Sequence, residues 1–86
     1  RLARILVREF GATRVLLVGS VATGRARRGS DLDLAVEGLP AEAYWKACAR
    51  IEAATTLPVD LIDLDTVSAA TAERLRREGV LLVERP

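Results

Sequence analysis

The sequence predicts a small α/β (α+β) domain in which helices flank a mixed sheet of three to four strands. Two observations support this fold class. Segments with a helical period alternate along the 86 residues with short runs rich in Val, Ile and Leu. The connection between the first two such runs is too short for a full parallel crossover, which takes about a dozen residues or more. These strands are therefore expected to be antiparallel, and residues 1–86 to form one domain.

The first half of the chain is expected to fold as helix, strand, short helix and strand. Residues 1–10 place apolar side chains near one stripe and arginines on the other, which is a helical period. The apolar run RVLLV, residues 14–18, is typical of a strand covered on both faces. Residues 20–26 then predict a short helix, and the alternating stretch DLDLAVE, residues 31–37, predicts a strand.

The second half repeats the alternation of helix and strand. The expected elements are a helix, a strand, a helix and a final apolar run over residues 41–54, 59–64, 66–77 and 80–84. Asp65 or Thr66 is expected to cap the second of these helices. The final run, VLLVE, is either a fourth strand or a buried tail.

The composition argues against several classes of function. Thirteen basic side chains balance twelve acidic ones, so no overall field would attract nucleic acid or anionic lipid. With one Phe, one Tyr and one Trp, the chain has few rings on which single-stranded bases could stack. With no histidine, a His-based triad or a His-ligated zinc site is excluded. Nucleic acid is therefore not an expected partner.

The cysteine content and the hydropathy pattern predict a cytoplasmic protein. Cys48 is the only cysteine, which excludes an internal disulfide and fits a reducing compartment. No apolar run approaches the roughly 18 residues of a membrane span, and no signal peptide is apparent. A core this small gives modest stability, and burial of surface against a second copy of the chain would add to it, so a homo-oligomer is compatible with the sequence.

Asp31 and Asp33 are candidate metal-binding or catalytic residues. Residues two apart in a strand point to the same face, so both carboxylates project together and repel one another. A hard divalent cation such as Mg²⁺, which takes oxygen ligands, would relieve that repulsion. Taken alone, the pattern is short and common, and two solvated aspartates on a strand edge would also explain it.

The residues before this pair favour a ligand pocket. Gly19 ends an apolar run and allows the backbone to turn sharply and to approach a ligand closely. Ser20 follows with a hydroxyl and an N–H at an expected helix N-terminus, where phosphate binds favourably. Cations able to meet phosphate oxygens follow on the loop: Arg25, Arg27 and Arg28. A phosphate-binding pocket beside a metal-binding pocket is what an enzyme needs for phosphoryl or nucleotidyl transfer.

The stretch GSVATGRARRGSDLD, residues 19–33, resembles the signature of the DNA polymerase β-like nucleotidyltransferase superfamily. Chain length and element order resemble the minimal nucleotidyltransferase (MNT) family, the antitoxin-type partners of HEPN-domain proteins. The resemblance implies the polymerase β palm-like nucleotidyltransferase fold. It also implies that Gly19 and Ser20 hold a triphosphate, with Arg25 and Arg27 as further phosphate-binding candidates. Asp31 and Asp33 would bind metal ions.

The resemblance also implies a third carboxylate, in the stretch PVDLIDLD, residues 58–65. Asp60 and Asp63 differ by an odd number, so on a regular strand they face opposite ways and only one can join the pair. The family pattern, an apolar residue, Asp and two apolar residues, favours Asp60. Many family members carry Arg where this chain has Thr23, which puts one phosphate contact in doubt.

The resemblance implies in-line attack on the α-phosphate of ATP or another nucleoside triphosphate, with release of pyrophosphate. Two Mg²⁺ ions would stabilise the attacking and departing oxygens. Asp60 would share a metal with Asp31 and Asp33 and help to deprotonate the acceptor hydroxyl. Asp31, Asp33 and Asp60 are thus the expected catalytic and metal-binding residues.

The expected function is Mg²⁺-dependent transfer of AMP from ATP to a hydroxyl of a HEPN-type toxin, which makes this chain the antitoxin. The alternative is a nucleotidyltransferase-like binding protein that neutralises a HEPN partner by contact, without catalysis. A binding protein needs an exposed anchor residue, and Tyr44 and Trp45 are the candidates. Adjacent residues of a helix point about 100° apart. At most one of them lies squarely in the core, and the other is a candidate interface anchor.

Overall fold

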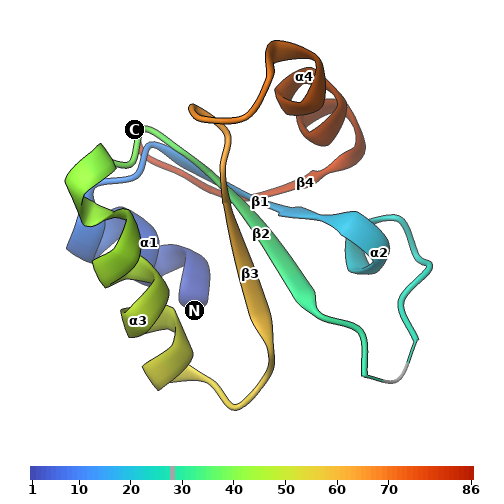
Figure 1. Cartoon of the computed structure of the whole chain (residues 1–86), viewed down its shortest axis with the longest axis horizontal. Helices are drawn as coiled ribbons and strands as arrows, with labels where there is room; N and C mark the ends of the chain where they lie inside the picture. Colours follow the sequence, from blue (N-terminus) through green and yellow to red (C-terminus); the bar gives the residue numbers. More distant parts are fainter. Residues whose placement is uncertain (28) are drawn as a thin grey trace.

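The computed structural model describes residues 1–27 and 29–86. Its elements follow the predicted order: α1 (Leu2–Phe10), β1 (Arg14–Val18), α2 (Gly19–Ala22), β2 (Leu32–Glu37), the 3₁₀ helix η1 (Ala41–Ala43), α3 (Tyr44–Ala54), β3 (Val59–Asp63), α4 (Ala69–Glu78) and β4 (Val80–Glu84). Within the described residues, four strands form one sheet in the order β3-β2-β1-β4 (Figure 1).

The sheet is mixed, as predicted. β1 pairs antiparallel with both β2 and β4, whereas β2 and β3 are parallel. The parallel pair is joined through η1 and α3, which provide the long crossover that parallel neighbours need. The predicted α+β class and the flanking helices are thus confirmed.

Helices cover both faces of the sheet. On one face, α1 and α3 pack against β1 and β2 through buried side chains such as Leu6, Ile51 and Leu34. On the other face, α4 packs Leu75 against Leu16, among others. Figure 1 shows α1 and α3 side by side on one side of the sheet and α4 on the other. Burial on both faces explains why β1 is continuously apolar.

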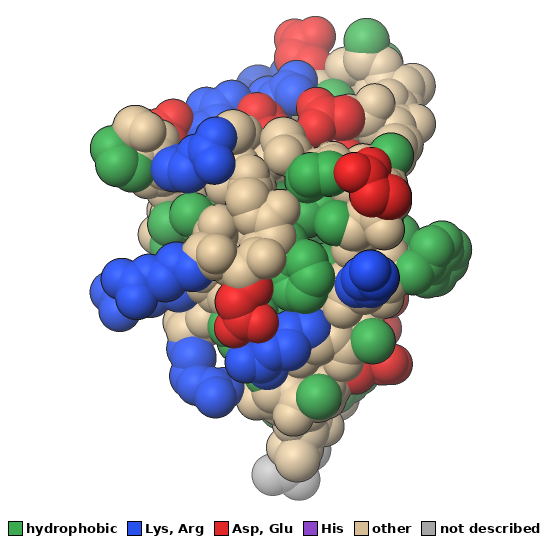
Figure 2. Space-filling model, turned by 90° about the vertical axis from the view of Figure 1, so that its left-hand side faces the viewer, with side chains coloured by type: hydrophobic (Ala, Val, Ile, Leu, Met, Phe, Trp, Pro, Cys, Tyr) green, Lys and Arg blue, Asp and Glu red, His purple; other side chains and the backbone are tan. Residues whose placement is uncertain are grey.

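Charged side chains of both signs are intermixed over α1 and α3 (Figure 2). One ion pair joins the two helices, since Arg50 Nε donates to Glu9 Oε1 over 3.0 Å. No helix within residues 1–27 and 29–86 is long and apolar enough to cross a membrane.

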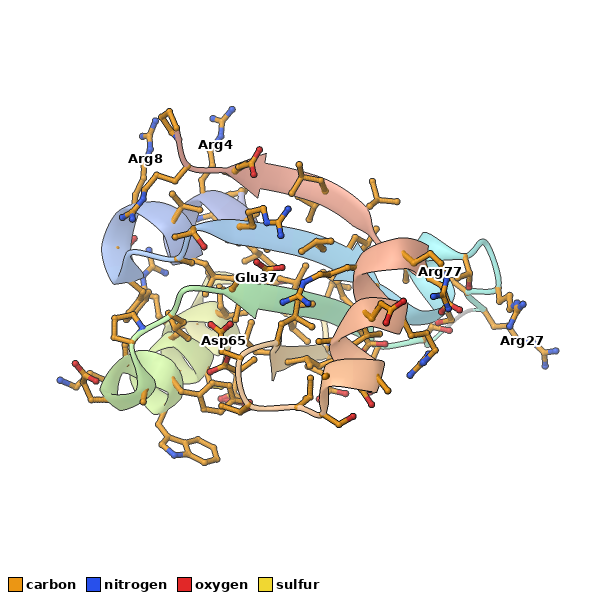
Figure 3. The ribbon with its side chains drawn as sticks, turned by 90° about the horizontal axis from the view of Figure 1, so that it is seen from above. Arg4, Arg8, Arg27, Glu37, Asp65 and Arg77 are labelled. Carbon is orange, nitrogen blue, oxygen red and sulfur yellow. The ribbon has the colours of Figure 1, made fainter. Side chains whose placement is uncertain are left out.

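Glu37, near the middle of the sheet in Figure 3, ties α4 to the strands. Its side chain is 13% exposed and accepts hydrogen bonds from Arg76 on α4 (2.7 Å) and Arg14 on β1 (3.0 Å). Burial tends to raise the pKa of Glu37, but the hydrogen bonds and charges of Arg76 and Arg14 outweigh it and lower the pKa below its usual value. This pairing holds α4 in place beside the Gly-Ser turn.

The predicted helix over residues 20–26 is wrong in its bounds. α2 begins at Gly19 and ends at Ala22. The Thr23 N–H makes the last α-helical bond, to the Gly19 carbonyl over 3.1 Å. The N–H groups of Gly24 and Arg25 then bond back to the Val21 and Ser20 carbonyls over 3.4 and 2.8 Å, which ends the helix. Gly24 then turns the chain with a φ of +76°.

The predicted cap of the last helix is also wrong. Ser68 caps α4, and its Oγ accepts a hydrogen bond from the Thr71 N–H over 3.2 Å. Asp65 instead accepts from the Gly38 N–H (2.8 Å), and the Thr66 hydroxyl donates to the Asp63 carbonyl (3.0 Å). Both of these side chains are used to fasten the loop before the helix.

The remaining differences lie at element ends. β2 starts at Leu32, one residue after Asp31, and β3 ends at Asp63. The segment predicted as one helix over 41–54 begins with the 3₁₀ turn η1. The final run is a strand at the sheet edge with Val80, Leu81 and Leu82 between 44% and 48% exposed, so the alternative of a buried tail is wrong.

Candidate active site

Asp33 and Asp60 lie at the same register position on neighbouring strands. β2 pairs with β3 so that these two residues are partners, and paired residues of parallel strands point to the same face. Asp31 precedes Asp33 by two residues, just before β2 begins. The three carboxylates therefore lie near one another at the end of the sheet where β2 and β3 start.

The electrostatics of Asp33 reflect this gathering. Burial raises the pKa of the Asp33 carboxyl, and the negative charges of Asp60 and then Asp31 raise it further. Asp31 and Asp60 are themselves exposed. Mutual repulsion of this kind is what a bound cation would relieve.

The residues fit a hard cation in their chemistry. Carboxylate oxygens are the ligands that Mg²⁺ takes in proteins. As the side chains of the described residues lie, no group of three acidic, histidine or cysteine residues is close enough to hold a metal ion. Asp31 and Asp60 are exposed, so their side chains can turn toward Asp33 without displacing the core.

Gly19 brings the end of β1 against this cluster. Val18 is the register partner of Asp33, so the next residue turns beside the carboxylate. A Cβ at position 19 would overlap Asp33 Oδ2 and lie 3.2 Å from its Cγ. The φ of Gly19 is +74°, a conformation that side chains rarely adopt. Both the conformation and the space therefore require glycine here.

The Gly-Ser turn presents backbone amides next to Asp33. The first N–H groups of a helical turn have no partner within it, and α2 consists of one turn that starts at Gly19. The Ser20 carbonyl is used locally, accepting from the Arg25 N–H over 2.8 Å. This bond folds the following loop back over the turn.

A hollow of about 240 Å³ opens beside this turn. It is lined by Gly19, Ser20, Thr23 and Arg25, and from α4 by Arg74, Leu75 and Glu78. Arg74 was not among the candidates from the sequence. It lies about fifty residues from the Gly-Ser motif, so no local spacing could indicate it; only the packing of α4 beside α2 brings it there.

The loop arginines differ in position. Arg25 lines the hollow, whereas Arg27 is exposed and points away from the molecule (Figure 3). The Arg27 N–H donates to Ser30 Oγ over 2.8 Å, which closes the turn before Asp31. Arg28, the third arginine of the loop, lies outside the described residues.

Asp63 does not join the cluster. It is buried, with 7% of its surface exposed, and its Oδ1 accepts a hydrogen bond from the Asp65 N–H over 2.9 Å. Because it lies three residues after Asp60 on β3, it faces the other side of the sheet. The structure thus brings Asp60, and not Asp63, beside Asp33.

The fold and this arrangement define a nucleotidyltransferase class of protein: a mixed sheet with a Gly-Ser turn held against strand carboxylates. The chain belongs to the family described as polymerase beta, nucleotidyltransferase, whose model matches residues 1–86. A search of curated proteins found no match.

The chain is similar to chains of solved structures, among them a toxin–antitoxin complex and a minimal nucleotidyltransferase. It is 27% identical to a chain of a toxin–antitoxin complex with AMP-PNP, with a TM-score of 0.78 over 98% of this chain and 72% of that one. It is 30% identical to a chain described as a minimal nucleotidyltransferase, with a TM-score of 0.77 over 94% and 85%.

A further neighbour is a chain of the complex between tri-AMPylated Shewanella oneidensis HEPN toxin and MNT antitoxin. Its identity is 24% and its TM-score 0.66, over 98% of this chain and 65% of that one. That likeness shows the fold alone.

Proposed function

We propose that this chain is a Mg²⁺-dependent nucleotidyltransferase that moves AMP from ATP to a hydroxyl of a HEPN-type toxin, and so acts as its antitoxin. Residues 1–86 would be its single domain, working in the cytoplasm. The observation that carries the proposal is the contact between Gly19 and Asp33, which sets a phosphate-binding turn against a carboxylate that pairs in register with Asp60.

Each residue has a role that its position supports. The N–H groups of Gly19 and Ser20 would bind phosphate oxygens, and Arg25 and Arg74 would add positive charge from the walls of the hollow. Arg27 remains a candidate only if its exposed side chain turns inward when nucleotide binds.

The carboxylates Asp31, Asp33 and Asp60 would hold Mg²⁺. When bound, Mg²⁺ supplies a positive charge that stabilises the developing charge on the phosphate oxygens. Asp60, the exposed member on β3, would accept the proton of the acceptor hydroxyl. The acceptor oxygen forms a bond to the α-phosphorus while the bond to pyrophosphate breaks, so AMP is transferred and pyrophosphate leaves.

Two findings support the substrate and the partner. The similar toxin–antitoxin complex holds AMP-PNP, an analogue of ATP. The other similar chain is described as a minimal nucleotidyltransferase. A nucleoside triphosphate and a toxin are therefore the ligands to test first.

The test is to incubate the chain with Mg²⁺, each α-labelled nucleoside triphosphate and the product of the neighbouring gene, which the proposal expects to be a HEPN protein. The wild-type chain is expected to label that protein from ATP, and the double variant Asp31→Asn/Asp33→Asn is expected not to. An absence of label with all four nucleotides would overturn the proposal.

The second candidate is neutralisation by contact alone. The exposure of Trp45, at 78%, favours it, because a large exposed aromatic side chain is typical of a binding anchor. Under this alternative, Asp31→Asn/Asp33→Asn protects cells from the toxin as well as the wild type does. Under the enzymatic proposal, the same variant fails to protect them.

A further inference from the structure

A row of adjoining hollows lies along β3, which is an edge strand of the sheet. It consists of three hollows of about 460, 260 and 410 Å³. The first and second share Trp45 and Leu61, and the second and third share Glu52 and Val59. We call this the β3 groove. Its last hollow is lined by Asp31 and Asp60, so the groove ends at the candidate active site.

Trp45 lines two of these hollows and packs against the neighbouring ring of Tyr44. Its ring meets Tyr44 edge-on, with centroids 5.0 Å apart and planes at 80°. The Tyr44 hydroxyl in turn donates to the Leu61 carbonyl of β3 over 2.6 Å. Trp45 is 78% exposed, and a large exposed aromatic ring offers apolar area of the kind found at interface anchors.

The charged side chains that line the groove are acidic. Its described lining includes the acidic residues Asp31, Glu52, Asp60 and Asp63, and none of those lining residues is Lys or Arg. Glu52 is exposed and lies on α3, outside the proposed Mg²⁺ ligands, so its charge persists whether or not metal is bound. Charge complementarity therefore calls for a basic occupant.

We propose that the β3 groove binds an extended, basic segment of the acceptor protein. An apolar side chain of this segment packs on Trp45, a Lys or Arg pairs with Glu52, and the acceptor hydroxyl reaches Asp60. The inference rests on the proposed function for what happens at Asp60, but docking in the groove requires no transfer.

The only tryptophan of the chain provides a direct probe of docking. The chain is labelled with 5-fluorotryptophan and used without nucleotide, so that no transfer takes place. On titration with the product of the neighbouring gene, the expected HEPN partner, the ¹⁹F signal of Trp45 is expected to shift. Trp45→Ala and Glu52→Arg, made without the label, should each weaken binding about tenfold or more in calorimetry.

Matched controls come from surfaces away from the groove. Leu82→Ala removes an exposed apolar side chain from β4, and Glu73→Arg reverses an exposed charge on α4. Both should bind the partner as the wild type does. All four variants should bind ATP analogue with unchanged affinity, because none of the four residues lines the hollow beside the Gly-Ser turn.

The outcomes separate docking from catalysis. A ¹⁹F shift with weakened binding of the two groove variants supports the docking site, even when the wild-type chain transfers no label, in which case only the proposed function fails. Wild-type binding by both Trp45→Ala and Glu52→Arg, or an unmoved ¹⁹F signal in a formed complex, overturns the docking site and leaves the proposed function standing.

Discussion

Gly19 lies so close to the carboxylate of Asp33 that any side chain at position 19 would displace Asp33 Oδ2. The two ends of the GSVATGRARRGSDLD stretch are therefore in contact across the β1–β2 pair. This contact explains why a glycine, and not simply a small residue, stands after β1, and it links the proposed phosphate and metal pockets.

Substituting Gly19 tests the contact. Gly19→Ala should lower the free energy of unfolding by about 1–2 kcal/mol, because alanine is strained at a φ of +74°. It should also reduce transfer about 100-fold, because Asp33 is moved. Gly11→Ala is the matched control: Gly11 has a φ of +78° and nothing within 4 Å of an added Cβ. Equal activity of the two variants in a transfer assay would contradict the contact's importance.

Asp33→Asn should make the protein more stable at neutral pH while abolishing transfer. The pKa of Asp33 is raised by burial and by Asp60 and Asp31, so ionising this carboxyl destabilises the folded state. The stability associated with its protonated form is fully present below about pH 3.9, the value in an unfolded chain, and is lost as the pH rises through the folded-state pKa.

The check is a pair of thermal melts. The Tm of Asp33→Asn should exceed that of the wild type at pH 7, and the difference should vanish near pH 3. Added Mg²⁺ should raise the Tm of the wild type at pH 7 by binding to the folded state, and should affect the variant less. A variant less stable than the wild type at pH 7 would contradict this account of the site.

Asp60 and Asp63 should respond in opposite ways. Asp60→Asn should reduce kcat about 100-fold or more with little effect on stability, because the side chain is exposed and proposed to accept a proton. Asp63→Ala should lower the free energy of unfolding by about 1–3 kcal/mol, because the Asp65 N–H loses its acceptor. Its kcat at saturating acceptor should be unchanged; a reversed pattern would assign the third carboxylate to Asp63.

Arg74 should contribute to nucleotide binding. Arg74→Ala is expected to raise the KM for ATP about tenfold, since a charge lining the phosphate hollow is removed. Arg77→Ala is the control: Arg77 lies on the same helix (Figure 3), pairs with a glutamate four positions away, as Arg74 does, and does not line the hollow. Equal KM values for the two variants would remove Arg74 from the site.

Local patterns predicted the elements and the central carboxylate pair. The period-2 rule puts Asp31 and Asp33 on one side, and the odd separation of Asp60 and Asp63 shows that only one of them can join. The sequence does not say which register β2 and β3 adopt, because that depends on how α3 packs. The structure supplies this, with Asp33 opposite Asp60.

The contacts that sequence could not indicate are those made by distant segments. Asp65 and Thr66 looked like helix caps because they precede a helical pattern. Asp65 instead accepts from the Gly38 N–H, which joins the segment after β3 to the segment after β2, and Ser68 caps α4. Arg74 reaches the Gly-Ser turn only because α4 folds back beside α2. Such pairings follow from tertiary packing, which local spacing does not encode.

The most direct test of the proposed active site is a crystal structure of the chain with Mn²⁺ and AMP-PNP, in which the anomalous signal of Mn²⁺ locates the metal. We expect a peak about 2.1 Å from oxygens of Asp33 and Asp60 or Asp31, with the triphosphate on the N–H groups of Gly19 and Ser20. A bound nucleotide elsewhere, or metal held by other residues, would contradict the account.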